Sequence, residues 1–138
     1  MKVRCIKDHA DSNNSSVWLV SWVNQTNLEI TVGKEYTVLA LENNGGKIFV
    51  QILCDLNDDY PLPFPIELFQ ISDNKVSKYW DCNFKVIQDI DELKPSDGKV
   101  ISFKLWRDMG SSFYEGLLNE SKIELTIFED FKNKMLSE

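Results

Sequence analysis

Apolar and polar residues alternate most regularly between residues 31 and 72. The alternation predicts strands over residues 36–41 and 48–54, because a repeat of two places successive side chains on opposite faces of a pleated strand. Asn and Gly at 43–46 separate these strands, and both residue types tolerate the positive φ of a tight turn. We therefore predict a β-hairpin. Both faces of its second strand are largely apolar, which is typical of a strand covered on two sides in a small barrel.

The next segment, residues 55–65, combines acidic residues with three alternating prolines. Pro61, Pro63 and Pro65 have no backbone N–H and cannot donate to a central ladder. We expect the segment to run extended, in a polyproline-like conformation, along a sheet edge or over one end of a barrel. Apolar residues then predict another strand over residues 66–71.

Other alternating patterns predict short strands over residues 2–7, 17–23, 84–87 and 100–106. The pattern over residues 17–23 is ambiguous. Trp18 and Trp22 favour a strand with both rings on one face, whereas Ser15 or Ser16 would equally cap a short helix. The strand is the preferred interpretation.

The C-terminal residues change to a helical period. Ser121 and Glu124 have the spacing of a capping box, which predicts a helix over residues 119–138. Its apolar face consists of Ile123, Ile127, Phe128, Phe131 and Met135. Its other face is expected to be solvated and carries Lys122, Glu129, Asp130, Lys132 and Lys134. Residues 113–118 are either a preceding helical turn or a loop.

The length of 138 residues and a hydrophobic content of 43% predict one globular domain. We expect an α+β fold with a β-barrel core over residues 1–72, strands and loops over 73–118, and the C-terminal helix packed on the barrel. The four tryptophans, Trp18, Trp22, Trp80 and Trp106, are expected in the core or at its edge.

Cellular location is predicted from two absences and from the cysteines. No apolar run approaches the roughly 18 residues of a membrane helix. Charged residues interrupt positions 1–8, as they would not in a signal peptide. Cys5, Cys54 and Cys82 are scattered and odd in number, so we expect reduced, buried thiols and a cytoplasmic protein.

The net charge of −7 is concentrated in the middle of the chain. Residues 43–74 carry five acidic side chains and one lysine. Such a field repels nucleic acid and anionic membranes and favours a basic partner. The residues expected to face that partner are Asp55, Asp58, Asp59, Tyr60 and Glu67.

No pattern in the sequence predicts catalysis, a cofactor or a metal. The acidic run over 55–59 begins like a calcium loop, but Tyr60 stands where that loop needs glycine and Ile66 where it needs glutamate. His9 and Cys5 lack the further ligands of a zinc site and the third member of a nucleophilic triad. We therefore expect neither a metal nor a cofactor, and no enzymatic activity.

Two stretches resemble a known family. They are Thr31-Val32-Gly33-Lys34-Glu35-Tyr36-Thr37-Val38 and, after the acidic turn, Pro63-Phe64-Pro65-x-Glu67-Leu68-Phe69. Together they resemble small bacterial proteins with an SH3-like barrel, which include immunity proteins of contact-dependent growth inhibition and related polymorphic toxin systems. The resemblance covers about residues 1–72.

This resemblance implies a partly open, SH3-like barrel and a function. The protein would neutralise a cognate bacterial toxin by stoichiometric binding and would be a monomer when free. Many such toxins are basic nucleases, and an acidic surface accelerates encounter with a basic protein. Two alternatives stay open: an SH3-like adaptor that binds an extended peptide through the proline-rich segment and Trp18 or Trp22, and, less favoured, a small hydrolase or metal enzyme.

Overall fold

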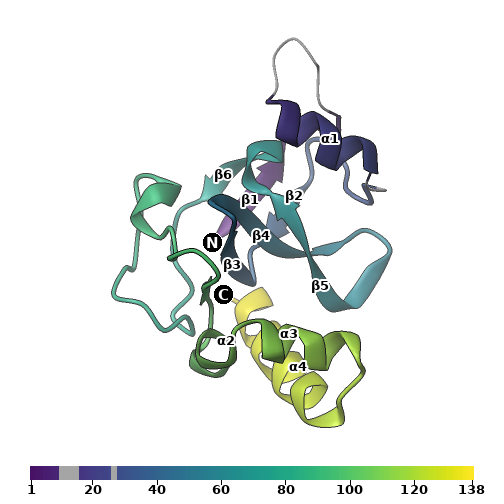
Figure 1. Cartoon of the computed structure of the whole chain (residues 1–138). Helices are drawn as coiled ribbons and strands as arrows, with labels where there is room; N and C mark the ends of the chain where they lie inside the picture. Colours follow the sequence, from purple (N-terminus) through teal and green to yellow (C-terminus); the bar gives the residue numbers. More distant parts are fainter. Residues whose placement is uncertain (10–15, 26–27) are drawn as a thin grey trace.

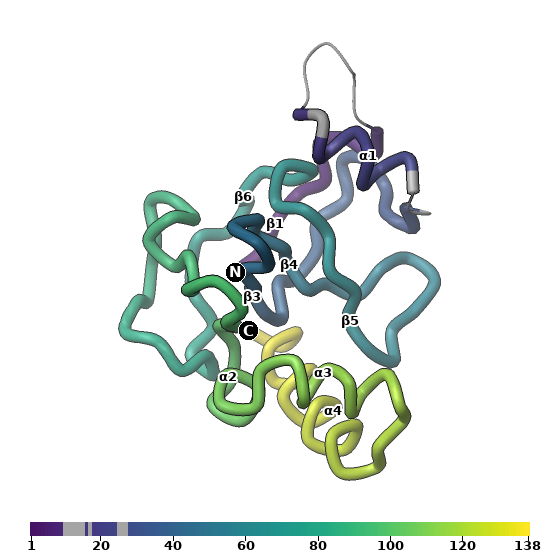
Figure 2. Tube along the Cα trace, in the orientation of Figure 1, coloured from purple at the N-terminus to yellow at the C-terminus, as the bar shows by residue number. Residues whose placement is uncertain are grey.

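The computed structural model describes residues 1–9, 16–25 and 28–138 (Figures 1 and 2). In this part of the chain, strands form two antiparallel sheets, and helices pack at their ends. The predicted α+β class is confirmed. The strands described form two separate sheets and no closed barrel. None of the described helices is long and apolar enough to cross a membrane.

The first sheet has three strands in the order β2-β1-β6. These are β1 (Lys2–Cys5), β2 (Glu35–Thr37) and β6 (Phe69–Asp73). Val3 in the central strand lies opposite Tyr36 on one side and Ile71 on the other. Val3 and Cys5 are buried, so one face of this short strand belongs to the core.

The second sheet has four strands in the order β5-β4-β3-β7. These are β3 (Ala40–Asn44), β4 (Lys47–Cys54), β5 (Asn57–Pro65) and β7 (Val100–Ile101). β3 and β4 form the predicted hairpin. Gly45 and Gly46 make its turn with φ of 63° and 82°, a conformation that glycine adopts without strain. The proline-rich segment is the extended edge strand β5, as predicted.

The single strand predicted over residues 36–41 is wrong, because the chain changes sheet within it. The N–H of Val38 donates to the carbonyl of Met1 in the first sheet, at 3.0 Å. The N–H of Leu39 donates to the carbonyl of Gln51 in the second sheet, at 2.8 Å. Both side chains are fully buried. The alternating pattern therefore continues across the break and hides it.

The strand predicted over residues 17–23 is also wrong. This segment is helix α1 (Val17–Gln25), and the hydroxyl of Ser16 accepts from the N–H of Leu19 at 3.1 Å. The helical alternative is thus correct, with Ser16 in the capping position; Ser15 lies outside the described residues. Trp18 packs edge-on against Phe49 of β4 at a ring distance of 5.8 Å.

Three further strand predictions fail in part. Residues 66–68 form the short 3₁₀ helix η1 (Ile66–Leu68) before β6 begins. Residues 84–87 contribute only an isolated bridge between Lys75 and Val86. After β7, residues predicted as strand form helix α2 (Lys104–Met109). A second 3₁₀ helix, η2 (Ile90–Glu92), lies between residues 84–87 and β7.

Helices α3 (Ser111–Leu118) and α4 (Lys122–Leu136) complete the chain. The first confirms the helical alternative for residues 113–118, and the second confirms the predicted C-terminal helix. Ser121 precedes α4, but its hydroxyl bonds to the carboxylate of Glu124 and not to a backbone N–H, so the capping box does not form.

One face of α4 differs from its prediction. Phe128 and Met135 are buried as expected, whereas Ile123 is 71% exposed. Lys132, expected to be solvated, is buried. Both predictions were wrong because the helix packs on α3 and β5 along a stripe rotated from the apolar one.

Within the described residues, one continuous cluster of buried side chains joins both sheets to the helices. Phe103 stacks on Phe131 of α4 at 4.1 Å, which fixes α4 against the segment after β7. Trp80 and Trp106 are buried and Trp18 and Trp22 are half-buried, so the placement predicted for the tryptophans is confirmed. The three cysteines are free; Cys5 and Cys54 are buried, and Cys82 is half-buried.

Candidate partner-binding groove

The five residues predicted to face a partner do not share one surface. Asp58, Asp59 and Tyr60 lie at the start of β5, while Asp55 lies in the turn before it. Glu67 lies in η1, beyond the other end of β5. The length of β5 separates Glu67 from Asp58 by roughly 20–25 Å at about 3.3 Å per residue. The start of β5 is the end that meets α3 and α4 (Figure 1).

A groove of about 750 Å³ opens between the start of β5 and the last two helices. Its lining residues are Asp59, Tyr60, Leu117, Glu120, Lys122, Leu125, Thr126, Glu129, Asp130 and Asn133. Two of the predicted residues, Asp59 and Tyr60, are therefore part of it. The remainder come from α3, α4 and the loop between them, which the sequence did not connect to the acidic turn.

The floor of this groove is apolar. Leu117 is fully buried, and Leu125 and Tyr60 are half-buried against the core. A shallow apolar floor between two elements is typical of a surface that contacts another molecule.

Its rim is acidic. Four carboxylates, Asp59, Glu120, Glu129 and Asp130, face one lysine, Lys122. Glu129 and Asp130 already have cationic partners within α4, Lys132 at 2.6 Å and Lys134 at 2.8 Å. In the described part of the chain, Asp59 and Glu120 have neither an ion pair nor a side-chain hydrogen bond. These two carboxylates are available to a ligand.

Glu120 has an unusual backbone. Its φ is +58°, and among the described residues it is the only non-glycine residue with a positive φ. It follows the last residues of α3, where its N–H donates to Leu117 and the N–H of Ser121 donates to Gly116. Glycine normally occupies this position after a helix because it adopts the left-handed conformation at no steric cost.

Lys132 holds the two walls of the groove together. Its ammonium donates to the backbone carbonyl of Asp58 at 3.1 Å and to the carboxylate of Glu129 at 2.6 Å. The aliphatic stem is buried while the charged end reaches the strand. Sequence reasoning placed Lys132 in solvent, although its spacing from Phe128 and Met135 puts it on the buried side of the helix.

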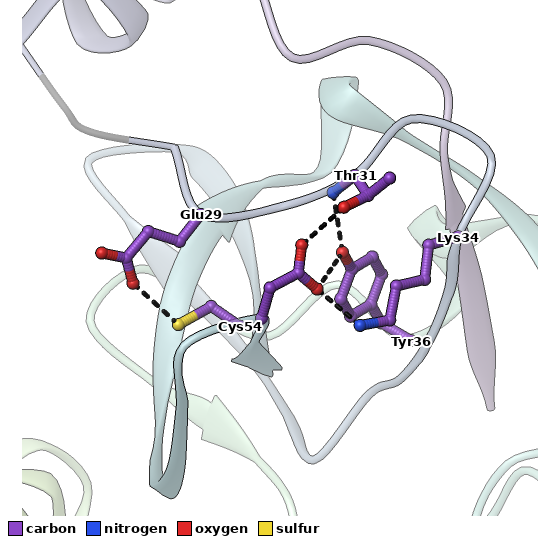
Figure 3. Close-up of polar contacts among 6 residues, drawn as sticks. Glu29, Thr31, Lys34, Tyr36 and Cys54 are labelled. Carbon is purple, nitrogen blue, oxygen red and sulfur yellow. Dashed lines mark hydrogen bonds and ion pairs between the residues drawn. The ribbon is translucent and has the colours of Figure 1, made fainter.

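Asp55 has a structural role and is not part of the groove. Its carboxylate accepts hydrogen bonds from Thr31 at 2.6 Å, Lys34 at 2.5 Å and Tyr36 at 2.9 Å (Figure 3). Burial raises the pKa of Asp55, but these three donors outweigh it and hold the pKa below its ordinary value. Burial and the charge of Asp55 raise the pKa of Tyr36 to about 12. Asp55 therefore fastens the β4–β5 turn to residues 31–36.

The residues considered for chemistry are not arranged for it. Burial raises the pKa of Cys5 and of Cys54, and Cys54 donates to a carboxylate of Glu29 at 3.3 Å, so both thiols stay protonated (Figure 3). His9 is exposed beside Asp8. Over residues 1–9, 16–25 and 28–138, no group of three or more His, Cys, Asp or Glu is placed to hold a metal ion.

The prolines of β5 point to its open edge. The carbonyl of Gln51 accepts a hydrogen bond from β3, so the backbone groups of Gln51 point away from β5. The residues on either side of Gln51 therefore point their backbone groups toward β5, where they pair with Leu62 and Phe64. Pro61 and Pro63 alternate with these residues and thus face outward without a donor. The carbonyl of Pro61 is taken by the hydroxyl of Tyr114 in α3, at 2.9 Å.

Comparison with known proteins adds no relative. Searches of protein families, of curated proteins and of solved structures each gave no match to the chain.

Proposed function

We propose that this protein is a non-catalytic binding protein that holds a basic segment of a partner protein in the groove between β5 and α4. The observation that supports this most directly is the combination of an apolar floor with two carboxylates, Asp59 and Glu120, that have no cationic partner among the described residues. An apolar floor supplies affinity, and unpaired rim charges supply selection of a cationic partner.

The resemblance over residues 1–72 suggests which class of protein the partner belongs to. We propose a cognate bacterial toxin that the protein neutralises by stoichiometric contact, as immunity proteins do. A basic nuclease is the toxin type that suits an acidic groove, since the same charges would compete with its nucleic-acid substrate. Nucleic acid and membranes are not proposed as partners, because the net charge of −7 repels both.

We further propose that the two sheets are related to a partly open SH3-like barrel. Support comes from the change of sheet at Val38 and Leu39 and from the three consecutive strands β3, β4 and β5 that follow it. We place the protein in the cytoplasm as a monomer when free; the three unpaired thiols are compatible with a reducing compartment.

The adaptor alternative receives less support. It needs the proline-rich segment to accept an extended peptide, but the outer edge of β5 offers no donor at Pro61 or Pro63. Trp18 and Trp22 are half-buried, and their rings already pack against Phe49 and Phe64.

The test is co-expression with the product of the adjacent upstream gene. We expect a one-to-one complex in size-exclusion chromatography with light scattering, and restored growth of cells that express the toxin. A double variant, Asp59→Asn with Glu120→Gln, should weaken the complex by about a hundredfold or more, because each of the two lost charge-assisted contacts is worth about 1.5–3 kcal/mol.

Asp91→Asn is the matched control. Asp91 is an exposed carboxylate in η2, within the segment that lies across the sheets from the β4–β5 hairpin (Figure 1). This variant should bind normally. If no toxin domain is encoded next to the gene and no basic protein binds, the proposal is wrong.

A further inference from the structure

The wall of the groove formed by β5 decides which backbone can lie against it. An extended segment forms a new strand only where the edge donates and accepts in alternation. Beyond Tyr60, this edge has no N–H at Pro61 or Pro63, and Tyr114 already donates to the carbonyl of Pro61. Burial and the nearby Glu42 and Tyr60 raise the pKa of Tyr114, which keeps its hydroxyl protonated and bound there.

The backbone groups of the first residues of β5 are also unavailable to an added strand. The N–H of Asp59 is bonded to the side chain of Asn57 at 2.9 Å, and the carbonyl of Asp58 accepts from Lys132. An extended segment would leave its own N–H and C=O groups unsatisfied along this wall. A helix satisfies its backbone internally, so it loses nothing against such an edge.

The opposite wall sets the length of the occupant. The groove follows α4 from Lys122 to Asn133 along one continuous stripe. Eleven helical steps of about 1.5 Å give a length of roughly 16 Å, which is about three turns. One face of a helix fits this space, and the rest of its circumference stays outside.

Chemistry changes along that length. Leu117 and Leu125 form the apolar part of the floor, and Glu129 and Asp130 lie about one turn beyond Leu125. The bond from Lys132 to the carbonyl of Asp58 brings the start of β5 to this same end. A partner surface that complements the groove therefore carries an apolar side chain and, one helical turn away, a cation.

We infer that the groove binds an amphipathic α-helix of about three turns, which places an apolar side chain over Leu125 and a Lys or Arg, three or four residues away, beside Asp59 at the end of the groove where Glu129 and Asp130 lie. This inference rests on the proposed function and specifies the partner segment. Charge complementarity and the closed β5 edge together support a helix from a basic partner, and a second copy of this chain would be repelled by its equal net charge of −7.

The experiment uses the full chain and two synthetic peptides of identical composition. One is a stapled helix of about 15 residues with Leu and Arg at i and i+4 spacing; the staple is needed because free helices of this length are marginal. The other contains D-residues that prevent the helix. Binding is measured by titration of amide NMR signals, which also locate the site.

We expect the helical peptide to shift signals of residues that line the groove and to bind at least about tenfold more tightly than its non-helical counterpart. Asp59→Asn should weaken this binding while the Asp91→Asn control does not. Thermal unfolding of each variant confirms that it is folded.

Equal affinity of the two peptides, or shifts located elsewhere, would overturn the helical occupant. Capture of the toxin by the wild-type chain would then still support the proposed function. The reverse result, helix binding without any toxin complex, supports the helical occupant and rejects the toxin.

Discussion

Glu120 has the least favourable backbone conformation of the described non-glycine residues. An L-residue in the left-handed region costs roughly 1–2 kcal/mol, whereas glycine costs less there but loses more entropy on folding. Glycine would adopt this conformation at the helix end more easily than glutamate. Because the carboxylate of Glu120 lines the groove, a role in binding would explain why glutamate is present here.

The Glu120→Gly variant is therefore expected to be more stable than the wild type, by roughly 0.5–1 kcal/mol, because relief of strain exceeds the entropic loss. Urea denaturation measures the change. Glu120→Gln removes the charge but keeps the strain, so its stability should stay near that of the wild type. Lower stability of the glycine variant would contradict the strain argument.

Lys132 is the residue at which a buried cation stabilises the fold. Lys132→Met keeps the aliphatic stem but removes the donor to the carbonyl of Asp58 and the ion pair with Glu129. We expect a loss of about 1–2 kcal/mol in unfolding free energy. Lys134→Met is the matched control, because its pair with Asp130 is exposed and should contribute less than about 0.5 kcal/mol. Equal effects of the two variants would show that burial does not matter here.

Single residues show what the sequence could predict of the site. Asp59 and Tyr60 were predicted from local charge and prolines, which are properties of one segment. Glu120 and Asp130 were not connected to them, because they join the groove only through the packing of α4 on β5. Asp55 looked identical to its acidic neighbours, and only its three donors distinguish it.

Among the elements, the β4–β5 turn is held by an ionised group, Asp55. The pKa of Asp55 is lower in the folded protein than in the unfolded chain, so folding favours the carboxylate. The contribution is complete above the unfolded pKa of 3.8 and is lost as the pH falls through the folded pKa.

We therefore expect Asp55→Asn to be less stable than the wild type at neutral pH, by about 1 kcal/mol, because the carboxylate is partly exposed and its bonds are weakened by solvent. The difference should shrink at about pH 3, where the wild type begins to lose the same charge. Urea unfolding at both pH values measures this. A difference that stays constant with pH would refute the role of the charge.

The prolines of β5 protect an edge that would otherwise pair with another chain. Pro63→Val restores an outward N–H on a strand with apolar neighbours, so we expect self-association at high concentration, detected by light scattering. Pro63→Lys restores the same N–H but adds a charge, and it should stay monomeric. Association of both variants, or of neither, would contradict this role.

Elements differ in how well their sequence predicts them. The β3–β4 hairpin and α4 have both a period and a boundary signal, Asn-Gly in one and Ser121 in the other, and the presence of each element was predicted correctly, although the hairpin's first strand starts at Ala40 and no capping box forms at Ser121. Residues 17–25 carry aromatic residues that favour a strand, but tertiary packing of Trp18 on Phe49 stabilises a helix. Residues 100–106 alternate, yet the chain turns into α2 after only two paired residues.

For the whole molecule, the net charge of −7 predicts the kinetics of binding. Association with the proposed basic toxin should slow by an order of magnitude or more between about 10 mM and about 500 mM salt, while dissociation changes less. Stopped-flow or surface-based kinetics would measure both rates. An association rate independent of salt would show that the acidic field does not guide the encounter.

The central position of β1 in the first sheet has a consequence for the chain during its synthesis. Both partners of β1 are made after it, and its last partner ends at Asp73. Until β2 is made β1 has two open edges, and until β6 is made it keeps one, and an open strand edge promotes aggregation. Lys2 and Arg4, which pair with Glu35 at 3.8 Å and 3.7 Å once the sheet forms, place charge on this strand while it waits. The same two side chains thus place charge on β1 before the sheet forms, as residues that oppose aggregation do, and form surface ion pairs afterwards.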